Sequence, residues 1–338
     1  MGAFLENICY FCSMNTLRVH IITQSKDLPV LDGTDFFHSP ELFRLMEQTA
    51  GVWPYMVVAE DAQGQVKGHL LAELCRRGSL IPPYLFTFGR IIGEGVYGEG
   101  VDKAVLFDQM LTALTRFLHR KLCLYVEVSD LSTKMFGYRS LRQNGFFPVR
   151  WMQIHNSLHS KPPRERLSDR TAHHLLRSER AGVVVREAQT AAEVSAYYRV
   201  LHAYYCTKLH RFIPKEEFFQ QLLHSPRARM LITYYKQRVV GGATIVVSGD
   251  DGYLWYVVAQ GKRYPSARPL AATVWRVLQA CHAHNLRHVF FLNVGLPFRR
   301  SPYRDFILGF GGKPVSSYRW FHFTIGWFNH LLSWFYRE

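Results

Sequence analysis

The sequence repeats one series of landmarks in its two halves, and this repeat limits the folds open to it. The first half contains, in order, Tyr138-Arg139, Gly145, Pro148-Val149, Trp151 and His155. The second half contains Tyr303-Arg304, Gly312, Pro314-Val315, Trp320 and His322. The offsets between paired landmarks are nearly constant, which chance rarely produces over several positions. The chain is therefore predicted to contain two copies of one domain.

The predicted elements of the second copy are clearest between Leu231 and Phe323. Runs rich in β-branched and aromatic residues, separated by Gly and Asp, predict an antiparallel meander over 231–235, 239–247 and 253–258. Apolar residues at helical spacing follow Pro269, a residue that suits the first helical turn, and a strand is expected at 289–294. The first copy shows the same order, with a hairpin, a helix over 103–119, a strand over 122–128 and a short helix ending at Gly145. This order is typical of the α+β class.

Three segments follow from these patterns. We expect an N-terminal domain over 15–160, a basic linker helix and strand over 161–186, and a C-terminal domain over 187–338. The linker contains Pro162-Pro163 and mixes basic with acidic residues. Each domain is expected to form a mixed, mostly antiparallel sheet with flanking helices.

The charge of the chain favours anionic partners. The 338 residues carry a formal net charge of +15, and the sequence pI is about 9.7. Such a field attracts RNA, nucleotide phosphates or an anionic membrane surface. A basic but ordinary surface is the equal alternative.

Cellular location and metal content can be predicted only in outline. The six cysteines are scattered, and Cys9-x-x-Cys12 has no second ligand pair nearby, so no metal site is expected. The first fourteen residues do not resemble a signal peptide, and either Met1 or Met14 could be the start. No uncharged apolar run approaches the roughly 20 residues that a spanning helix needs. We therefore expect a cytoplasmic protein, with peripheral contact at the inner membrane face as an option.

Two segments carry a resemblance to a known family. Leu175–Arg186 is similar to the basic helix that leads into the second domain of the FemAB-like transferases, which are tandem GNAT proteins. The segment Phe306-Ile307-Leu308-Gly309-Phe310-Gly311-Gly312-Lys313-Pro314 is similar to the family element Phe-Lys-x-x-Phe-Gly-Gly-x-Pro. The resemblance implies two GNAT-like domains and acyl or aminoacyl transfer, with acyl-CoA or aminoacyl-tRNA as co-substrate and no tightly bound cofactor. FemAB-like members use peptidoglycan precursors as acceptors, so an anionic cell-envelope acceptor, lipid-linked in one version, is expected. The family lysine falls on Ile307, which puts tRNA-dependent chemistry in doubt.

GNAT chemistry requires few side chains, because the site holds an amine against an acyl carbonyl and stabilises the oxyanion. The resemblance implies that the strands at 253–258 and 289–294 diverge and leave backbone N–H groups free for the carbonyl. Tyr256 or Tyr303 is the candidate that protonates the leaving group, and Arg304 is the nearest basic residue to Ile307. The alternative is that both tyrosines are packed aromatics.

Substrate-binding candidates are mostly cationic. Lys262, Arg263 and Arg268 precede a predicted helix and could hold a phosphate there, although the loop lacks the Gln/Arg-x-x-Gly-x-Gly/Ala pattern of GNAT enzymes. Residues 90–95 have that pattern, and we interpret them as a structural turn, with a nucleotide-binding loop as the alternative. The remaining candidates are residues expected to contact an acidic acceptor or to line the cleft: Lys208, Arg211, Asn293 and Arg299.

The C-terminal segment 326–336 predicts an amphipathic helix that packs on its own domain or lies in a membrane interface. Two rivals to the transferase stay open. One is a non-catalytic RNA- or membrane-binding protein that kept the fold, for which Ile307 is the main support. The other is a structural dimer formed through the C-terminal helix. The sequence leaves the donor, the acceptor and the oligomeric state undetermined.

Overall fold

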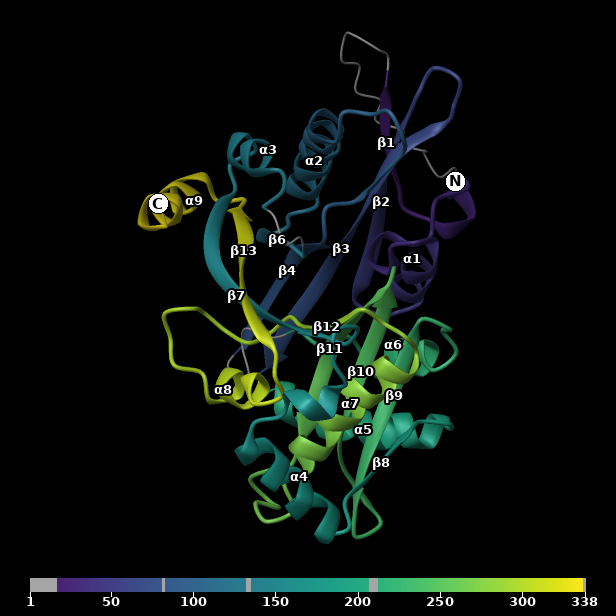
Figure 1. The fold of residues 1–338 in the computed structure, drawn as a ribbon. Helices are drawn as coiled ribbons and strands as arrows, with labels where there is room; N and C mark the ends of the chain where they lie inside the picture. The colour runs from purple at the N-terminus through teal and green to yellow at the C-terminus, as the bar shows by residue number, and fades with distance from the viewer. Residues whose placement is uncertain (1–16, 81–82, 132–134, 207–211, 337–338) are drawn as a thin grey trace. The chain divides into compact units, whose positions relative to one another are not determined.

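The chain folds into two compact units. A computed structural model describes residues 17–80, 83–131, 135–206 and 212–336. The first unit comprises Met1–Arg150 and Ser317–Glu338, and the second unit comprises Trp151–Ser316. The elements of the first half, drawn in Figure 1, are β1 (Arg18–Ile22), α1 (Pro40–Glu47), β2 (Val52–Glu60), β3 (Val66–Leu80), β4 (Pro83–Ile92), β5 (Val96–Tyr97), α2 (Lys103–Arg120), β6 (Tyr125–Ser129), α3 (Tyr138–Gln143) and β7 (Phe147–Ser157).

The second half repeats this order after a basic helix. Its elements are α4 (Asp169–Arg180), β8 (Val184–Glu187), α5 (Ala191–Tyr205), α6 (Glu216–Leu222), β9 (Ala228–Tyr235), β10 (Arg238–Ser248), β11 (Asp251–Ala259), α7 (Pro269–Ala283), β12 (His288–Phe291), α8 (Pro302–Leu308), β13 (Lys313–Phe323) and α9 (Gly326–Phe335). The predicted duplication and α+β class are therefore confirmed. The Tyr-Arg landmarks lie on the equivalent helices α3 and α8, and the Trp landmarks lie on β7 and β13.

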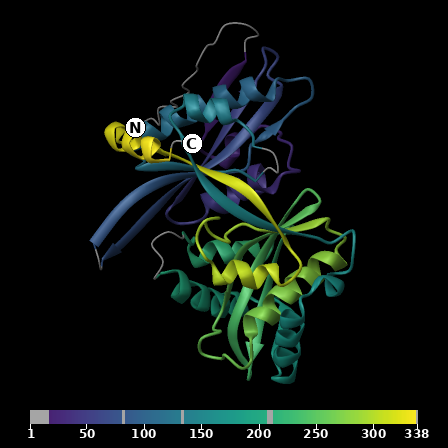
Figure 2. The same cartoon turned by 60° about the vertical axis from the view of Figure 1, so that its left-hand side comes forward.

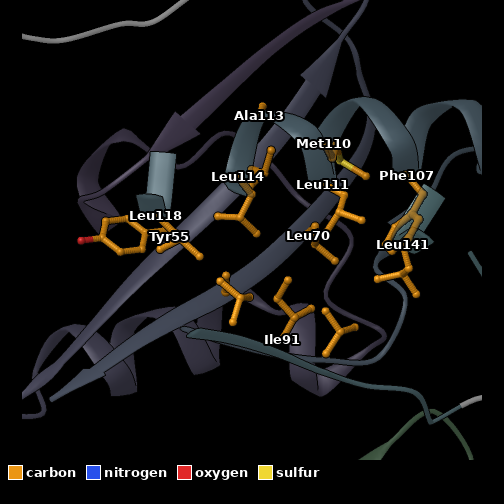
Figure 3. Packing of buried hydrophobic residues seen from close by; sticks show 14 of the residues in the cluster. Tyr55, Leu70, Ile91, Phe107, Met110, Leu111, Ala113, Leu114, Leu118 and Leu141 are labelled. Atoms are coloured by element: carbon orange, nitrogen blue, oxygen red, sulfur yellow. The ribbon is translucent and has the colours of Figure 1, made fainter. Parts of the chain in front are cut away.

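The sheet of the first unit has the strand order β1-β2-β3-β4-β6-β13, and β5 pairs with β3. Its neighbouring strands are antiparallel except for β4 and β6, which are parallel. Helix α2 packs its apolar face on this sheet. Leu111 and Leu114 of α2 are fully buried opposite Leu70 and Ile91 of the strands (Figure 3). Burial of such leucines is the main stabilising contribution of this unit.

The sheet of the second unit has the order β7-β12-β11-β10-β9-β8, again with one parallel pair, β11 and β12. Helix α7 covers it much as α2 covers the first sheet. Val274 and Leu278 of α7 share a buried cluster with Ile245 and Phe291 of the strands. The two units thus use the same packing scheme.

Each sheet takes its last strand from the other half of the sequence. Strand β7 pairs antiparallel with β12, from His288 opposite Ser157 to Phe291 opposite Ile154. Strand β13 pairs antiparallel with β6, with Arg319 opposite Ser129. The expected domain limits at 160 and 187 keep both strands with their own sequence copies, so this exchange was not anticipated. The periodicity of a strand says which of its faces is buried but not which neighbour it pairs with.

Within the described residues, no helix is long and apolar enough to cross a membrane. Helix α1 begins at Pro40, and its N-cap Ser39 accepts a hydrogen bond from the Leu42 N–H at 3.1 Å. Satisfying this otherwise unpaired N–H group stabilises the helix by about 1 kcal/mol.

The glycine-rich turn at 90–95 closes on a buried histidine. Gly93 and Gly95 have φ values of +95° and +92°, a conformation that favours glycine. The Gly95 N–H faces Nε2 of His38 at 3.0 Å, and the Leu71 N–H faces Nδ1 at 3.0 Å. His38 is completely buried. The turn therefore serves the packing of the first unit, which supports its structural interpretation.

We expect His38 to make the protein less stable in mild acid. Burial lowers the pKa of His38 to about 4, against 6.5 in the unfolded chain. The unfolded state therefore binds a proton between these values and the folded state does not, so the free energy of unfolding falls as pH drops from 6.5 to 4, by an amount on the order of 3 kcal/mol. Urea unfolding at several pH values measures this. His38→Gln should flatten the slope, whereas His20→Gln on β1 should retain it. An unchanged slope in His38→Gln would contradict the assignment.

Candidate active site

The two parallel strands of the second unit separate partway along. Their pairing runs from Asp251 opposite His288 to Leu254 opposite Phe291, where β12 ends, while β11 continues to Ala259. On its other side, β11 is bulged. Leu254 pairs with Ile245 and Tyr256 pairs with Thr244, so Trp255 is the extra residue. A bulge bends a strand and disrupts its ladder. The ladder between β11 and β12 therefore ends at Leu254, while β11 stays paired with β10 through Ala259.

The equivalent strands of the first unit stay paired to their ends. The β4–β6 ladder runs from Phe88 opposite Tyr125 to Ile92 opposite Ser129. The Gly93 N–H extends it by donating to the Ser129 carbonyl at 2.9 Å. No register shift interrupts the pairing of β4 with β3. In the second unit β11 thus extends beyond its parallel partner, whereas in the first unit the two parallel strands end together.

The helices α2 and α7, which follow these strands in the two units, differ in how their N-termini are capped. Asp102 caps α2, and its carboxylate accepts from the N–H groups of Ala104 and Val105 at 2.9 and 3.2 Å. The N-cap of α7 is Arg268, in the left-handed conformation with φ of 48°, and its side chain makes no capping hydrogen bond. The positive end of a helix dipole favours an anion. In the first unit a carboxylate occupies that end, whereas in the second unit the end lies beside an arginine.

The predicted phosphate-binding cations lie between β11 and α7, and Arg268 is the N-cap of α7. Lys262, Arg263 and Arg268 are all exposed in the loop that joins β11 to α7. The Arg263 guanidinium lies 5.6 Å from the ring centroid of Tyr264. The loop thus places three positive charges in sequence between the diverging strand and the helix. Lys208 and Arg211, predicted to contact an acceptor, lie outside the described residues.

The segment after β12 is held by Arg304. Its Nη1 donates to the Leu296 carbonyl at 2.9 Å, and its Nη2 donates to the Arg299 carbonyl at 3.0 Å. These bonds favour a positioning role for Arg304 over direct contact with substrate. The Arg299 side chain is exposed, and Asn293 is half-buried. Ile307, on the same helix as Arg304, is completely buried in the core of the unit.

The two candidate tyrosines differ in their surroundings. Tyr256 directly follows the bulge and is 3% exposed. Its ring packs against Tyr205 of α5 and Phe219 of α6, with centroid distances of 6.1 and 5.2 Å. Tyr303 on α8 is half-buried against the second core. Tyr256 therefore has the better backbone position, and Tyr303 has the better access.

Sequence reasoning missed the bulge at Trp255 and the contrast between Asp102 and Arg268. A bulge has no side-chain signature in one sequence, because it depends on how two strands are paired. The contrast could have been found by aligning the two copies at their helix starts. Among the described residues, no group of three or more His, Cys, Asp and Glu side chains could hold a metal ion.

Two units of the same α+β order, one with diverging parallel strands beside a helix N-terminus, define a tandem GNAT-like protein. Residues 163–300 match the family described as an acetyltransferase (GNAT) domain. The matched segment contains the diverging strands and the cationic loop. The prediction of an acyltransferase enzyme is confirmed at the level of this class. No curated protein matches the sequence.

Solved structures share the fold over nearly the whole chain. A crystal structure of FemX has a TM-score of 0.59 at 10% identity, covering 91% of this chain and 96% of FemX. L-PGS from Bacillus licheniformis has a TM-score of 0.55 at 10% identity, covering 88% of this chain and 92% of its own. A tandem GNAT protein from the clavulanic acid biosynthesis pathway has a TM-score of 0.54 at 11% identity, covering 90% and 98%. The resemblance to FemAB-like tandem GNAT proteins is thus confirmed for the fold.

Proposed function

We propose that the protein transfers an acyl or aminoacyl group to an amine on an anionic acceptor, and that the reaction takes place in the second unit. One observation carries this proposal. The parallel ladder of β11 and β12 stops at Leu254 and Phe291, while the matching ladder of the first unit continues to its end. The opening lies within the segment that matches the GNAT family.

The proposed chemistry uses the edge of β11 that β12 stops covering at Leu254. A donor carbonyl on that edge would accept from a β11 backbone N–H group that points away from β10, and this hydrogen bond would stabilise the oxyanion of the tetrahedral intermediate. The acceptor amine forms the new C–N bond, and the C–S or C–O bond to the donor then breaks. The amine loses a proton, and the leaving thiolate or ribose oxygen gains one. Tyr256 and Tyr303 are the candidates that supply it.

We favour acyl-CoA over aminoacyl-tRNA as the donor. Lys262, Arg263 and Arg268 next to the α7 N-terminus suit the phosphates of CoA. Ile307 occupies the position of the family lysine and is buried in the core, so this helix offers no cation there. FemX and L-PGS support the aminoacyl alternative only through the shared fold.

The proposed acceptor is an amine on an anionic molecule of the cell envelope. This molecule is a peptidoglycan precursor or a lipid-linked compound. The net charge of +15 supports an anionic acceptor. Another structure of this fold, at 9% identity, is named for a lysylphosphatidylglycerol synthetase from Agrobacterium fabrum, an enzyme named for an aminoacylated phospholipid. A cytoplasmic location at the inner membrane face is part of the same proposal.

Ile307 also supports a second candidate, a non-catalytic RNA- or membrane-binding protein that retained the fold. This candidate predicts binding that falls steeply with salt and no turnover. The non-catalytic candidate gives no role to the early end of the β11–β12 ladder, so we rank it below the transferase.

Donor binding tests the proposal directly. We expect acetyl-CoA to bind with a dissociation constant in the micromolar range by calorimetry, and CoA to bind similarly because the phosphates supply most of the contacts. Uncharged and aminoacylated tRNA are titrated in parallel. Preference for aminoacylated over uncharged tRNA would favour the tRNA donor. Equal salt-sensitive binding of both tRNAs, without acetyl-CoA binding, would favour the second candidate. Binding of neither donor at millimolar or saturating concentration would overturn the enzyme proposal.

A further inference from the structure

Helix α9 turns its apolar side outward. Trp327, Trp334 and Phe335 are 73%, 65% and 69% exposed, and Leu331 is exposed on the same side. These positions fall within one arc at the helical period of 3.6 residues. The buried residue of this helix is Asn329. A helix that packs on its own domain buries the opposite set.

Polar contacts attach α9 to the first unit. The Asn329 side chain donates to the Gly145 carbonyl at 2.9 Å and accepts from the Phe323 N–H at 2.8 Å. Phe328 adds an edge-to-face contact with Phe323, with centroids 5.0 Å apart. Figure 1 shows α9, in yellow, close to α3, and Figure 2 shows the same yellow helix from a second side. The helix is therefore fixed in place while its tryptophans stay available.

The turn before β6 contains a second exposed apolar residue, Leu122, which follows two exposed cations. Leu122 is 85% exposed, with φ of 55°. The backbone of this turn is tied to the residue that precedes α9, since the Thr324 N–H donates to the Leu124 carbonyl at 3.0 Å and its hydroxyl donates to the Cys123 carbonyl. Arg120 and Lys121, which precede Leu122, are exposed.

We propose that these residues form a lipid anchor that inserts into the headgroup region of an anionic bilayer. The anchor consists of exposed apolar side chains with basic neighbours: Arg120, Lys121, Leu122, Trp327, Leu331, Trp334 and Phe335. Tryptophan is the side chain that favours the membrane–water interface, and basic residues beside it add attraction to anionic lipids. Helix α9 contains no acidic residue that would oppose this.

Charge argues for a membrane rather than a second copy of the chain. Two-fold association through this surface would bring Arg120 and Lys121 of both copies onto one interface, and α9 offers no carboxylate to pair with them. An anionic bilayer neutralises the same charges. Insertion into the bilayer then removes the exposed aromatic side chains from water, and no partner protein is needed to cover them.

Vesicle flotation of the full chain tests the anchor. We expect the protein to float with vesicles of phosphatidylcholine and phosphatidylglycerol and to float much less with phosphatidylcholine alone. Trp327→Ala with Trp334→Ala should weaken binding to the mixed vesicles roughly 100-fold, because neither indole ring would then insert into the bilayer. Arg120→Ala and Lys121→Ala should each weaken it roughly five-fold, mainly at low salt.

Trp53→Ala is the matched control, because Trp53 is an exposed tryptophan of the same unit on β2. It should float like the parent chain, and all variants should unfold at the parent temperature. The proposal is overturned if the parent chain binds neither vesicle, if the double variant binds as the parent does, or if light scattering shows a dimer that only the double variant loses. Acetyl-CoA binding by the double variant in solution should be unchanged, which separates failure of the anchor from failure of the proposed chemistry.

Discussion

Replacing Gly311 by alanine is expected to lower the free energy of unfolding by about 3 kcal/mol or more. Gly311 has φ of +83°, where a side chain is strained. A β-carbon at this position would also lie 2.5 Å from the Arg166 carbonyl oxygen, which is backbone and cannot move aside as a flexible side chain does. The strain and the clash add. Chemical unfolding followed by circular dichroism measures the loss.

Two glycines separate these contributions. Gly182 has φ of +78° with nothing within 4 Å of a built β-carbon, so Gly182→Ala should cost only the strain, about 1 kcal/mol. Gly261 has neither a positive φ nor a close neighbour, so Gly261→Ala should be close to neutral. If Gly311→Ala is no worse than Gly182→Ala, the close approach to Arg166 is not a real constraint.

Gly311 belongs to the motif that carries the family resemblance, and its neighbours in that motif are also closely packed. Phe310-Gly311-Gly312 packs against the linker and β7: the Asn156 amide donates to the Phe310 carbonyl at 2.9 Å, and a β-carbon on Gly312 would overlap Asn156 and Ile154. These glycines are needed for close backbone approach. The glycines of this motif therefore serve the packing of the second unit.

Removal of the three loop cations is expected to weaken acyl-CoA binding about 100-fold. The variant is Lys262→Ala with Arg263→Ala and Arg268→Ala. Each charge-assisted contact with a phosphate at an exposed site contributes roughly 1 kcal/mol. The loss should appear mainly in KM and be smaller at high salt, while kcat changes little because these residues do not contact the reacting carbonyl.

A variant with the same loss of charge is the control. Arg170, Arg177 and Arg180 are exposed on α4 of the same unit, and their replacement by alanine should change KM less than about three-fold, because these residues contribute only to the general field. An equal loss in both triple variants would show that the loop holds no phosphate. Unchanged binding in the loop variant would move the donor site away from the α7 N-terminus.

Local patterns were sufficient to predict the elements of the fold. The helix at Pro40 follows from its Ser39 cap, and the repeated Tyr-Arg landmarks correctly predicted equivalent helices in both halves. These features depend on residues close together in the chain, so one sequence contains them. The cationic loop and the outward aromatic residues of α9 were also visible, but their exposure was not.

The sequence by itself determined two α+β copies, their order of elements and a basic chain. Only the tertiary structure decided that β7 and β13 change places, that the β11–β12 ladder ends at Leu254 beside a bulge, and that α9 buries Asn329 rather than its tryptophans. The physical reason is common to all three. Side-chain period fixes the face of a strand or helix that is apolar, whereas the partner of that face is chosen by pairing between residues far apart in the chain.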